Sequence, residues 1–320
     1  GLIKLRGDRC WRDLTCLYYH HQTQPMPNPL SWYFHRLPKW VHRLEVAGNH
    51  VAQLVVPFGL FAPQPVASAA GLIVLVHQGW LILSGNFAWL NVLTLALAFA
   101  AVDDRWLGAL LPLEPGPLTP PPTWQVGLTL AFGLLLLVLS YWPARNLLSR
   151  RQLMNYSFNR FHLGNTYGAF GSISRERYEV VLEGTDEPEP TAATVWREYE
   201  FKGKPGDPRR RPPQVAPYHL RLGWLMWFAA MSPPGSHRWL LPLVERLLAG
   251  DRATLRLLAQ NPFPDRPPAF VRASFYHYRF TTWRERRASG AWWVRSRVGG
   301  YLPPYCLAPS GEPPAPEAGP

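Results

Sequence analysis

The sequence predicts a polytopic α-helical membrane segment followed by a soluble α+β domain with an antiparallel sheet. Two observations predict this order. Residues 66–142 contain three apolar runs without a charged side chain, and about 20 such residues suffice to cross a hydrocarbon core. After residue 150 the chain becomes polar and basic, with short segments of alternating bulky and polar residues, which is typical of antiparallel strands.

Residues 1–39 precede the apolar runs and are polar, aromatic and rich in histidine. Pro25, Pro27 and Pro29 exclude a helix interior around them, because proline lacks the backbone donor and clashes with the preceding turn. An extended extramembrane loop is therefore expected here. Since the chain begins at Gly1 without a signal-peptide pattern, we also expect that an N-terminal region is missing.

Residues 40–142 are expected to supply two to four transmembrane helices. The run at 124–142 is bracketed by Trp124 and Trp142, as interfacial aromatic residues are. The run at 66–84 is long enough to span, 87–102 is short, and 40–62 is interrupted by polar residues. A buried core helix is the alternative for each run. With two or four spans, the segments on either side of this region lie on the same side of the bilayer.

Orientation is less well determined. The chain carries a net charge of +12, of which +9 falls in residues 150–320. Arg145, Arg150 and Arg151 follow the last run closely, and the positive-inside rule would place the C-terminal part in the cytoplasm. That rule is weak for a large domain.

The domain at 150–308 is expected to mix strands and helices. Gly250 and Asp251 divide residues 238–263 into two helices, with Asp251 as the cap of the second. The tail, 309–320, is disordered by composition. The remaining expected elements are strands at 177–185 and 194–203, a helix at 219–231, and paired strands at 269–283 and 291–304.

A basic run follows the second expected strand and raises the question of nucleic acid. Arg209, Arg210 and Arg211 could bind phosphate groups. However, acidic residues are interleaved with the run and no nucleic-acid-binding motif accompanies it. A solvated loop with local ion pairs is expected, and a headgroup or protein contact is the alternative. Trp224 and Trp227, on the next helix, are either core residues or contacts with a client.

A second group of polar residues lies near the first apolar run. Five of the ten histidines fall within residues 20–50. His42, Glu45 and Asn49 share one face of a helix, which suggests either a metal or proton-handling site or a polar seam between helices. Without an HExxH pattern, we expect no metal and no cofactor.

The three cysteines do not resemble a zinc site. Cys10 and Cys16 either form a disulfide in an oxidising compartment or remain free thiols. Because three cysteines cannot all pair within one chain, Cys306 is left without a partner in the first case. The sequence also has no P-loop, no GxSxG elbow and no recognisable triad. Nothing in these motifs marks a soluble hydrolase.

Four blocks in this order together resemble the lipase maturation factor family over residues 1 to about 304. They are GLIKLRGDRCWRDLTCLYYHHQTQPMPNPLSWYFHRLP, NRFHLGNTYGAFGSISRERYEVVLEGT, WREYEFKGKPGDPRRRPPQVAPYHLRLGWLMWFAA and the segment from LLAQNPFPDRPPAFVRASFYHYRF to WWVRSRVGGYLPP. The resemblance implies a non-catalytic membrane protein that assists folding and assembly of secreted lipases or related clients. It implies residence in the endoplasmic reticulum membrane with a lumenal C-terminal domain for an animal protein, and in the plasma membrane for a bacterial one.

One departure from the animal pattern concerns cysteine. Animal members tend to carry cysteine near the block around EFKGKPGD, and this chain has Gly203 and Pro213 in that region instead. The departure fits a bacterial homologue, whose client would be unknown.

A fainter resemblance suggests an alternative. Gly1, Lys4, Leu5 and Trp11 look like a block of the vitamin K-dependent carboxylase superfamily of membrane domains, in which the lysine is associated with base chemistry. A lysine in an apolar setting can act as a base once its pKa is lowered. The alternative is thus a membrane-embedded enzyme that uses Lys4 and the face carrying His42 and Glu45.

Overall fold

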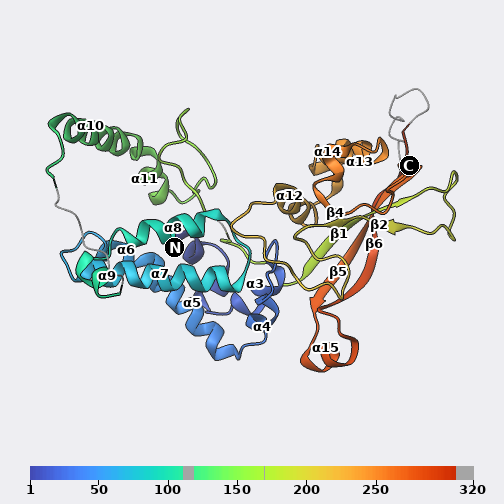
Figure 1. Ribbon diagram of the computed structural model, residues 1–320, viewed down its shortest axis with the longest axis horizontal. Coiled ribbons are helices and arrows are strands. Elements are labelled where there is room, and N and C mark those ends of the chain that lie inside the picture. Colours follow the sequence, from blue (N-terminus) through green and yellow to red (C-terminus); the bar gives the residue numbers. More distant parts are fainter. Residues whose placement is uncertain (111–118, 169, 308–320) are drawn as a thin grey trace.

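The structure is a computed structural model, and it describes residues 1–110, 119–168 and 170–307. It has a helical N-terminal part and a C-terminal domain built on a sheet, which lie side by side along the long axis (Figure 1). The helices of the first part are α1 (Leu2–Arg6), α2 (Arg9–Arg12), α3 (Leu17–Thr23), α4 (Ser31–His35), α5 (Lys39–Leu54), α6 (Val56–Gly59), α7 (Val66–Ser84), α8 (Trp89–Phe99), α9 (Asp104–Leu110), α10 (Thr123–Leu139) and α11 (Tyr141–Leu148).

Residues 1–39 are not the expected extended loop, because they form four short helices, α1 to α4. As predicted, Pro25, Pro27 and Pro29 lie outside any helix, in the segment between α3 and α4. Asp8 caps α2 by accepting a hydrogen bond from the backbone N–H of Cys10. Cys10 and Cys16 form a disulfide, which decides between the two alternatives that the sequence left open.

Two helical stretches, α7 and the continuous α10–α11 segment (Thr123–Leu148), are long and apolar enough to cross a membrane. The polytopic character of this region stays a prediction. The run at 87–102 forms the shorter helix α8, and the run at 40–62 is divided between α5 and α6. The sixteen-residue α5 buries His42, Val46, Asn49 and Ala52, so its polar face packs against protein.

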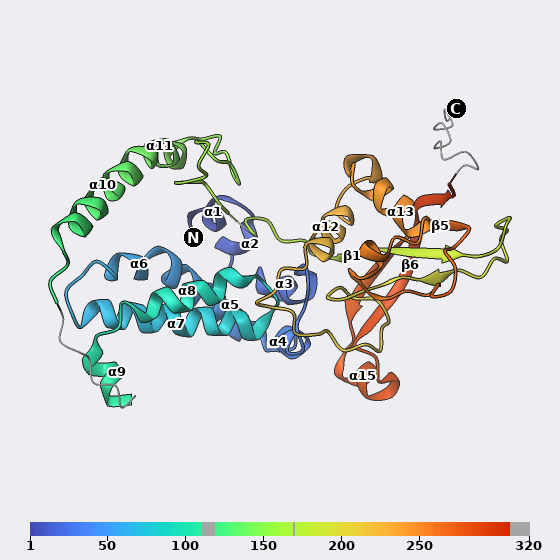
Figure 2. The ribbon, with the colours of Figure 1, turned by 45° about the horizontal axis from the view of Figure 1, so that its top comes forward.

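Helix α10 has no buried residue, although its sequence is apolar on all sides. In both views it lies apart from the group formed by α5 to α8 (Figures 1 and 2). Such a helix needs an apolar surrounding. Helices α7 and α8, in contrast, pack against each other, and Asn91 donates a hydrogen bond to Gln78 between them over 2.7 Å.

The C-terminal domain contains an antiparallel four-stranded sheet with strand order β2-β1-β5-β6 and a separate pair, β3-β4. Its strands β1 and β5 pair without a register shift, with Val180 opposite Phe275, whereas the pairing of β5 with β6 is irregular. Its elements are β1 (Arg177–Thr185), β2 (Arg197–Glu198), β3 (Glu200–Phe201), α12 (Arg221–Ala229), the short 3-10 helix η1 (Pro234–Ser236), α13 (Leu240–Leu248), α14 (Arg252–Leu255), β4 (Leu258–Gln260), β5 (Phe270–Phe280), α15 (Trp283–Ser289) and β6 (Trp293–Tyr305).

Most expected elements of this domain are present, but the second helix predicted within residues 238–263 is wrong beyond its first turn, because α14 ends at Leu255 and Leu258–Gln260 form strand β4. The strand at 177–185 has the predicted bounds, and Asp251 caps α14 by accepting from the N–H of Thr254. The expected strand at 194–203 is reduced to β2 and β3, because the chain changes partner there: β2 pairs with β1, and β3 pairs with β4. The tail at 309–320 lies outside the described residues, and the proposed division into four segments stays a prediction.

Two apolar clusters hold the domain together. The larger one joins β1 and β5 to helices α12 and α13, with Leu182, Met226 and Leu247 fully buried. The second is aromatic and lies where β5 and β6 meet the N-terminal part, and it consists of Trp32, Tyr278, Phe280, Trp292 and Trp293. Because Trp32 comes from α4, the core of the domain includes a residue of the helical part.

Candidate functional site

The basic connector, residues 202–213, is not a solvated loop along its whole length. Arg210 pairs with Glu200 at 2.6 Å and donates to the backbone carbonyl of Phe201. Arg211 donates to the carbonyl of Pro29 and stacks over Trp292, 5.3 Å from the ring centre. Arg209 is exposed. The three arginines therefore differ: one braces the connector, one reaches the helical part, and one faces solvent.

The same connector carries Lys204 into a buried charge network. Lys204 forms an ion pair with Glu179 on β1, and Arg177 forms a second one with the same carboxylate at 2.5 Å. All three side chains are almost completely inaccessible. Burial lowers the pKa of Lys204 from its ordinary value, and the adjacent Glu179 opposes that shift. A single carboxylate thus balances two cations at the start of β1.

Arg177 extends this network into the helical part. Its Nη1 donates to the backbone carbonyl of Gln22 over 2.9 Å, and its Nη2 donates to that of Pro25 over 3.0 Å. Asn86, after α7, donates to the carbonyl of Pro213, and its side-chain oxygen accepts from the N–H of Val215. These hydrogen bonds connect strand β1 and the connector to the proline-rich segment. We call the region where the sheet domain contacts the helical part the joint, and Arg177, Pro25 and Asn86 form its first part.

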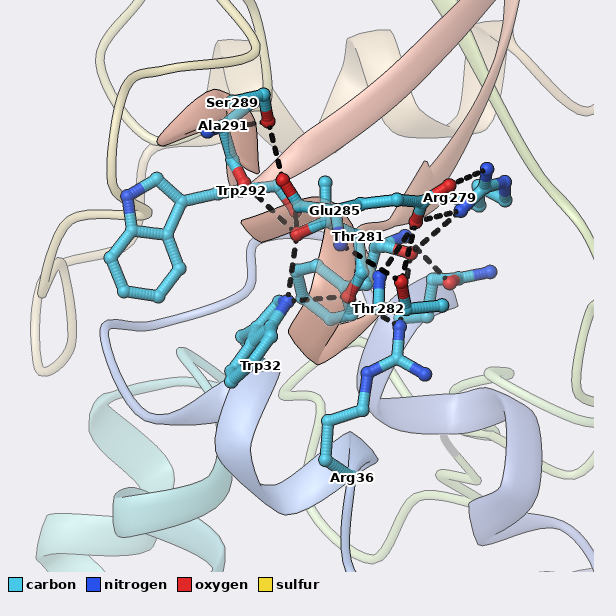
Figure 3. Close-up of polar contacts among 11 residues, drawn as sticks. Trp32, Arg36, Arg279, Thr281, Thr282, Glu285, Ser289, Ala291 and Trp292 are labelled. Carbon is cyan, nitrogen blue, oxygen red and sulfur yellow. Dashed lines mark hydrogen bonds and ion pairs between the residues drawn. The ribbon is translucent and has the colours of Figure 1, made fainter. Parts of the chain in front are cut away.

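A second part of the joint lies at the hairpin between β5 and β6 (Figure 3). The indole of Trp32 donates to the carbonyl of Thr281 over 2.9 Å, and Arg36 donates to that of Phe280 over 3.0 Å. Thr282 and Glu285 form a capping box at the start of α15. The hairpin is thus held from its own side by a helix cap and from the other side by α4.

A cleft of about 520 Å³ opens beside the joint. Trp227 stands at its wall and donates its indole N–H to the carbonyl of Thr23 over 3.0 Å. Trp224 stacks on His219 and does not line the cleft. The cleft is lined by Thr23, Ser174, Arg175, Glu176, Arg177, Tyr178, Trp227, Ala230 and Met231. It offers aromatic, aliphatic and charged groups together, which suits a segment of another protein.

Within the helical part, the structure brings His42 and Glu45 together as their spacing on α5 predicts, at 2.7 Å between Nδ1 and Oε2. It adds His21 from α3, whose Nε2 lies 3.8 Å from the same oxygen. Asn49 is not part of this group, because it accepts a hydrogen bond from Lys4 over 2.8 Å.

Lys4 is largely buried by α5 and by Trp11, whose ring centre lies 4.6 Å from Nζ. Burial lowers the pKa of Lys4 to about 8. A fraction of this amine is therefore neutral near physiological pH and could accept a proton.

Sequence reasoning missed three residues that organise these sites. From the sequence, His21 is one of five histidines within residues 20–50, Arg177 begins an expected strand, and Trp32 lies in an expected loop. A histidine pair next to a proline-rich segment was the one available signal for His21. The contacts that Arg177 and Trp32 make between the two parts of the chain join residues at least 152 positions apart, so no local pattern could indicate them.

Two family models match the chain in order. The lipase maturation factor transmembrane domain matches residues 1–109, and the lipase maturation factor C-terminal domain matches residues 163–303. The first covers α1 to α8 and all but the last residue of α9, and the second covers the sheet except for the last two residues of β6. Both parts of the joint thus lie within matched regions.

Curated relatives agree with these matches. Lipase maturation factor 1 from Homo sapiens is 47% identical over 96% of this chain and 58% of its own length. The Mus musculus protein is 45% identical over the same shares, and lipase maturation factor 2 from Homo sapiens is 28% identical. The chain therefore spans little more than half the length of these relatives. No solved structure matches it.

Proposed function

The chain belongs to the lipase maturation factor family, and we propose that it forms part of a membrane protein that assists folding and assembly of a secreted lipase or a related client, without a chemical step of its own. The observation that carries this proposal is the ordered match of both family domains, which together reach from residue 1 to residue 303.

Membrane association follows from the transmembrane-domain match and from the apolar helices α7 and α10. The exposed, uniformly apolar surface of α10 supports a position in lipid. For a eukaryotic protein we place the chain in the endoplasmic reticulum membrane, and for a bacterial one in the plasma membrane.

The client would bind at the cleft beside the joint. Buried bonds from Arg177 and Trp32 fix the sheet domain on the helical part, so the cleft wall is a rigid surface. Trp227 and Met231 offer apolar contact, and Arg175 offers charge. Aromatic, methionine and arginine side chains are the types that protein interfaces favour.

The client would meet this surface in an oxidising compartment. A disulfide between Cys10 and Cys16 is stable on the lumenal or external side of a membrane rather than in the cytosol. Trp11 donates its indole N–H to the carbonyl of Phe170, which leads into the sheet domain. The disulfide and the sheet domain therefore lie on the same side of the membrane. This favours a lumenal domain over the cytoplasmic placement that the arginine distribution suggested.

The test is rescue of lipase secretion. The full-length protein is expressed in cells that lack their own lipase maturation factor, together with a secreted lipase. We expect active lipase in the medium and recovery of lipase with the solubilised protein. If secretion stays at the level of empty cells while the protein reaches the membrane intact, the proposal fails for that client class.

The buried Lys4 favours one second candidate, a membrane-embedded enzyme that uses Lys4, His42 and Glu45. Its lowered pKa is the observation in favour. Substituting the three residues singly separates the two functions. If Lys4→Met, His42→Ala and Glu45→Gln all rescue secretion while changes in the cleft abolish it, the enzyme candidate is lost.

A further inference from the structure

Three potential ligand groups converge in the helical part, and none of them lines the cleft. His21 on α3 and His42 and Glu45 on α5 each direct one nitrogen or oxygen at the others, and these atoms lie within 4.8 Å of one another. Nδ1 of His42 is 2.7 Å and Nε2 of His21 is 3.8 Å from Oε2 of Glu45. Ligands of one tetrahedral zinc ion lie about 3.3 Å apart, given metal–ligand bonds of about 2.0–2.1 Å. The observed separations bracket that value.

His21 is the residue that a purely structural role does not explain. Its side chain is 3% exposed, and neither ring nitrogen has a hydrogen-bond partner in the described part of the chain. A buried polar group without a partner is unfavourable by about 1–3 kcal/mol. A polar seam between helices would satisfy these nitrogens, whereas here Nε2 is aimed at the carboxylate and stops short of bonding it. A cation between them would take up that nitrogen.

Glu45 supplies the charge argument. Its side chain is 6% exposed, and within the described residues its ion-pair partners are His21 and His42. A buried carboxylate needs a compensating positive charge. Protonating one imidazole would supply it but would leave the other histidine unpaired. One divalent cation would balance the carboxylate and bind both imidazoles in their neutral form.

The surroundings hold these groups in place. The indole of Trp80 on α7 donates to the other carboxylate oxygen, Oε1, over 2.7 Å. Phe34 packs edge-on against Trp80 and tilted against His21, with ring centres 5.1 and 5.7 Å away. Oε2 is thereby fixed toward the histidines. Hydrogen-bonded carboxylates of this kind are a regular feature of metal sites.

We propose that His21, His42 and Glu45 bind one divalent transition cation of the zinc type. Two imidazoles and a carboxylate are the ligands such ions prefer, and three protein ligands leave a position for water. From the sequence, a metal site on the face of His42 and Glu45 was one alternative, although no metal was expected. The structure replaces Asn49 by His21 as the third group.

The experiment measures zinc on the full-length protein purified in detergent, stripped with a chelator and reloaded with zinc alone. We expect about one zinc per chain by elemental analysis and by competition with a fluorescent chelator. His21→Ala and Glu45→Gln should abolish stoichiometric binding. Trp80→Phe keeps the ring but removes the donor to Glu45, and it should weaken binding by about 10–100-fold.

The matched control is His20→Ala, which removes the neighbouring buried histidine on the same helix. His20 stacks on Phe87 outside the cluster, so its loss should leave zinc binding unchanged. Size-exclusion profile and thermal unfolding show that each variant is folded. The proposal is overturned if the reloaded wild type holds no zinc, or if folded His21→Ala and Glu45→Gln bind zinc as the wild type does.

Discussion

Arg177, the first residue of β1, donates Nη1–H to the backbone carbonyl of Gln22, 2.9 Å away and 155 positions earlier in the chain. The guanidinium is fully enclosed, and its charge is met by Glu179 on the same strand. One side chain therefore ties the sheet to the end of α3 and, through Pro25, to the segment that follows it. The stability of the sheet domain and that of the helical part are therefore coupled through Arg177.

The first prediction is that Arg177→Met strongly destabilises the protein. It removes the bonds to Gln22 and Pro25 and leaves Glu179 with Lys204 alone. Removing one partner of a buried ion pair costs about 3–5 kcal/mol. We expect a lower thermal unfolding midpoint in detergent and rapid protease cleavage between α3 and α4.

Arg175→Met is the control for this change. Arg175 also forms an ion pair, with Asp8 at 2.8 Å, but its side chain is 43% exposed. Exposed pairs contribute about 0–1 kcal/mol. Equal unfolding midpoints for the two variants would show that Arg177 does not hold the joint.

The second prediction concerns the connector. Arg210→Glu places a carboxylate beside Glu200 and removes the bonds to the carbonyls of Phe201 and Lys202. We expect a loss of membrane-inserted, protease-resistant protein. Arg209→Glu changes the charge equally at an exposed side chain and should leave folding intact. If both reversals fold normally and both lose client recovery, the connector acts through charge at the surface rather than through its internal bonds.

These cases show what the sequence could and could not predict. The strand 177–185 was predicted because β-strand composition and a glycine turn are local signals. The burial of Arg177 and Lys204 was not, since a basic residue in a polar segment is ordinarily exposed and the partners come from distant parts of the chain. Helices α1 to α4 were missed because four to seven residues are too few to show a helical period.

The same distinction applies to the candidate site. His42 and Glu45 were placed on one face correctly, because spacing along one helix fixes their relation. His21 lies on another helix, and only the packing of α3 against α5 brings it to the carboxylate. Lys4 and Asn49 meet in the same way, from α1 and α5.

The third prediction is a pH dependence at Lys4. Its pKa is about 8 in the folded protein and about 10.5 in the unfolded chain. Between these values the unfolded state binds more protons, so stability rises with pH across this window. The loss of stability that comes from burying the charged amine is present in full below pH 8 and disappears above pH 10.5. At about 1.4 kcal/mol per pH unit, this loss is at most about 3 kcal/mol.

Thermal unfolding of the wild type and of Lys4→Met between pH 7.5 and 10.5 measures this effect. Because other groups titrate in both proteins, the difference between the two midpoints is the relevant quantity. It should shift in favour of the wild type as pH rises. A difference that stays constant over the range would mean that Lys4 is hydrated in the folded protein.

The fourth prediction separates client binding from folding. Met231 lines the cleft and is 48% exposed. Met231→Glu therefore introduces a charge without burying it, and the free energy of unfolding should stay within about 0.5 kcal/mol of the wild type. If the cleft receives a client segment, a carboxylate at this apolar contact should reduce secreted lipase activity and lipase recovery several-fold.

Val298→Glu is the matched control, because Val298 is an exposed apolar residue, 57% accessible, that does not line the cleft. Equal loss of lipase from both variants would place the client contact elsewhere on the sheet, and no loss from either would exclude the cleft.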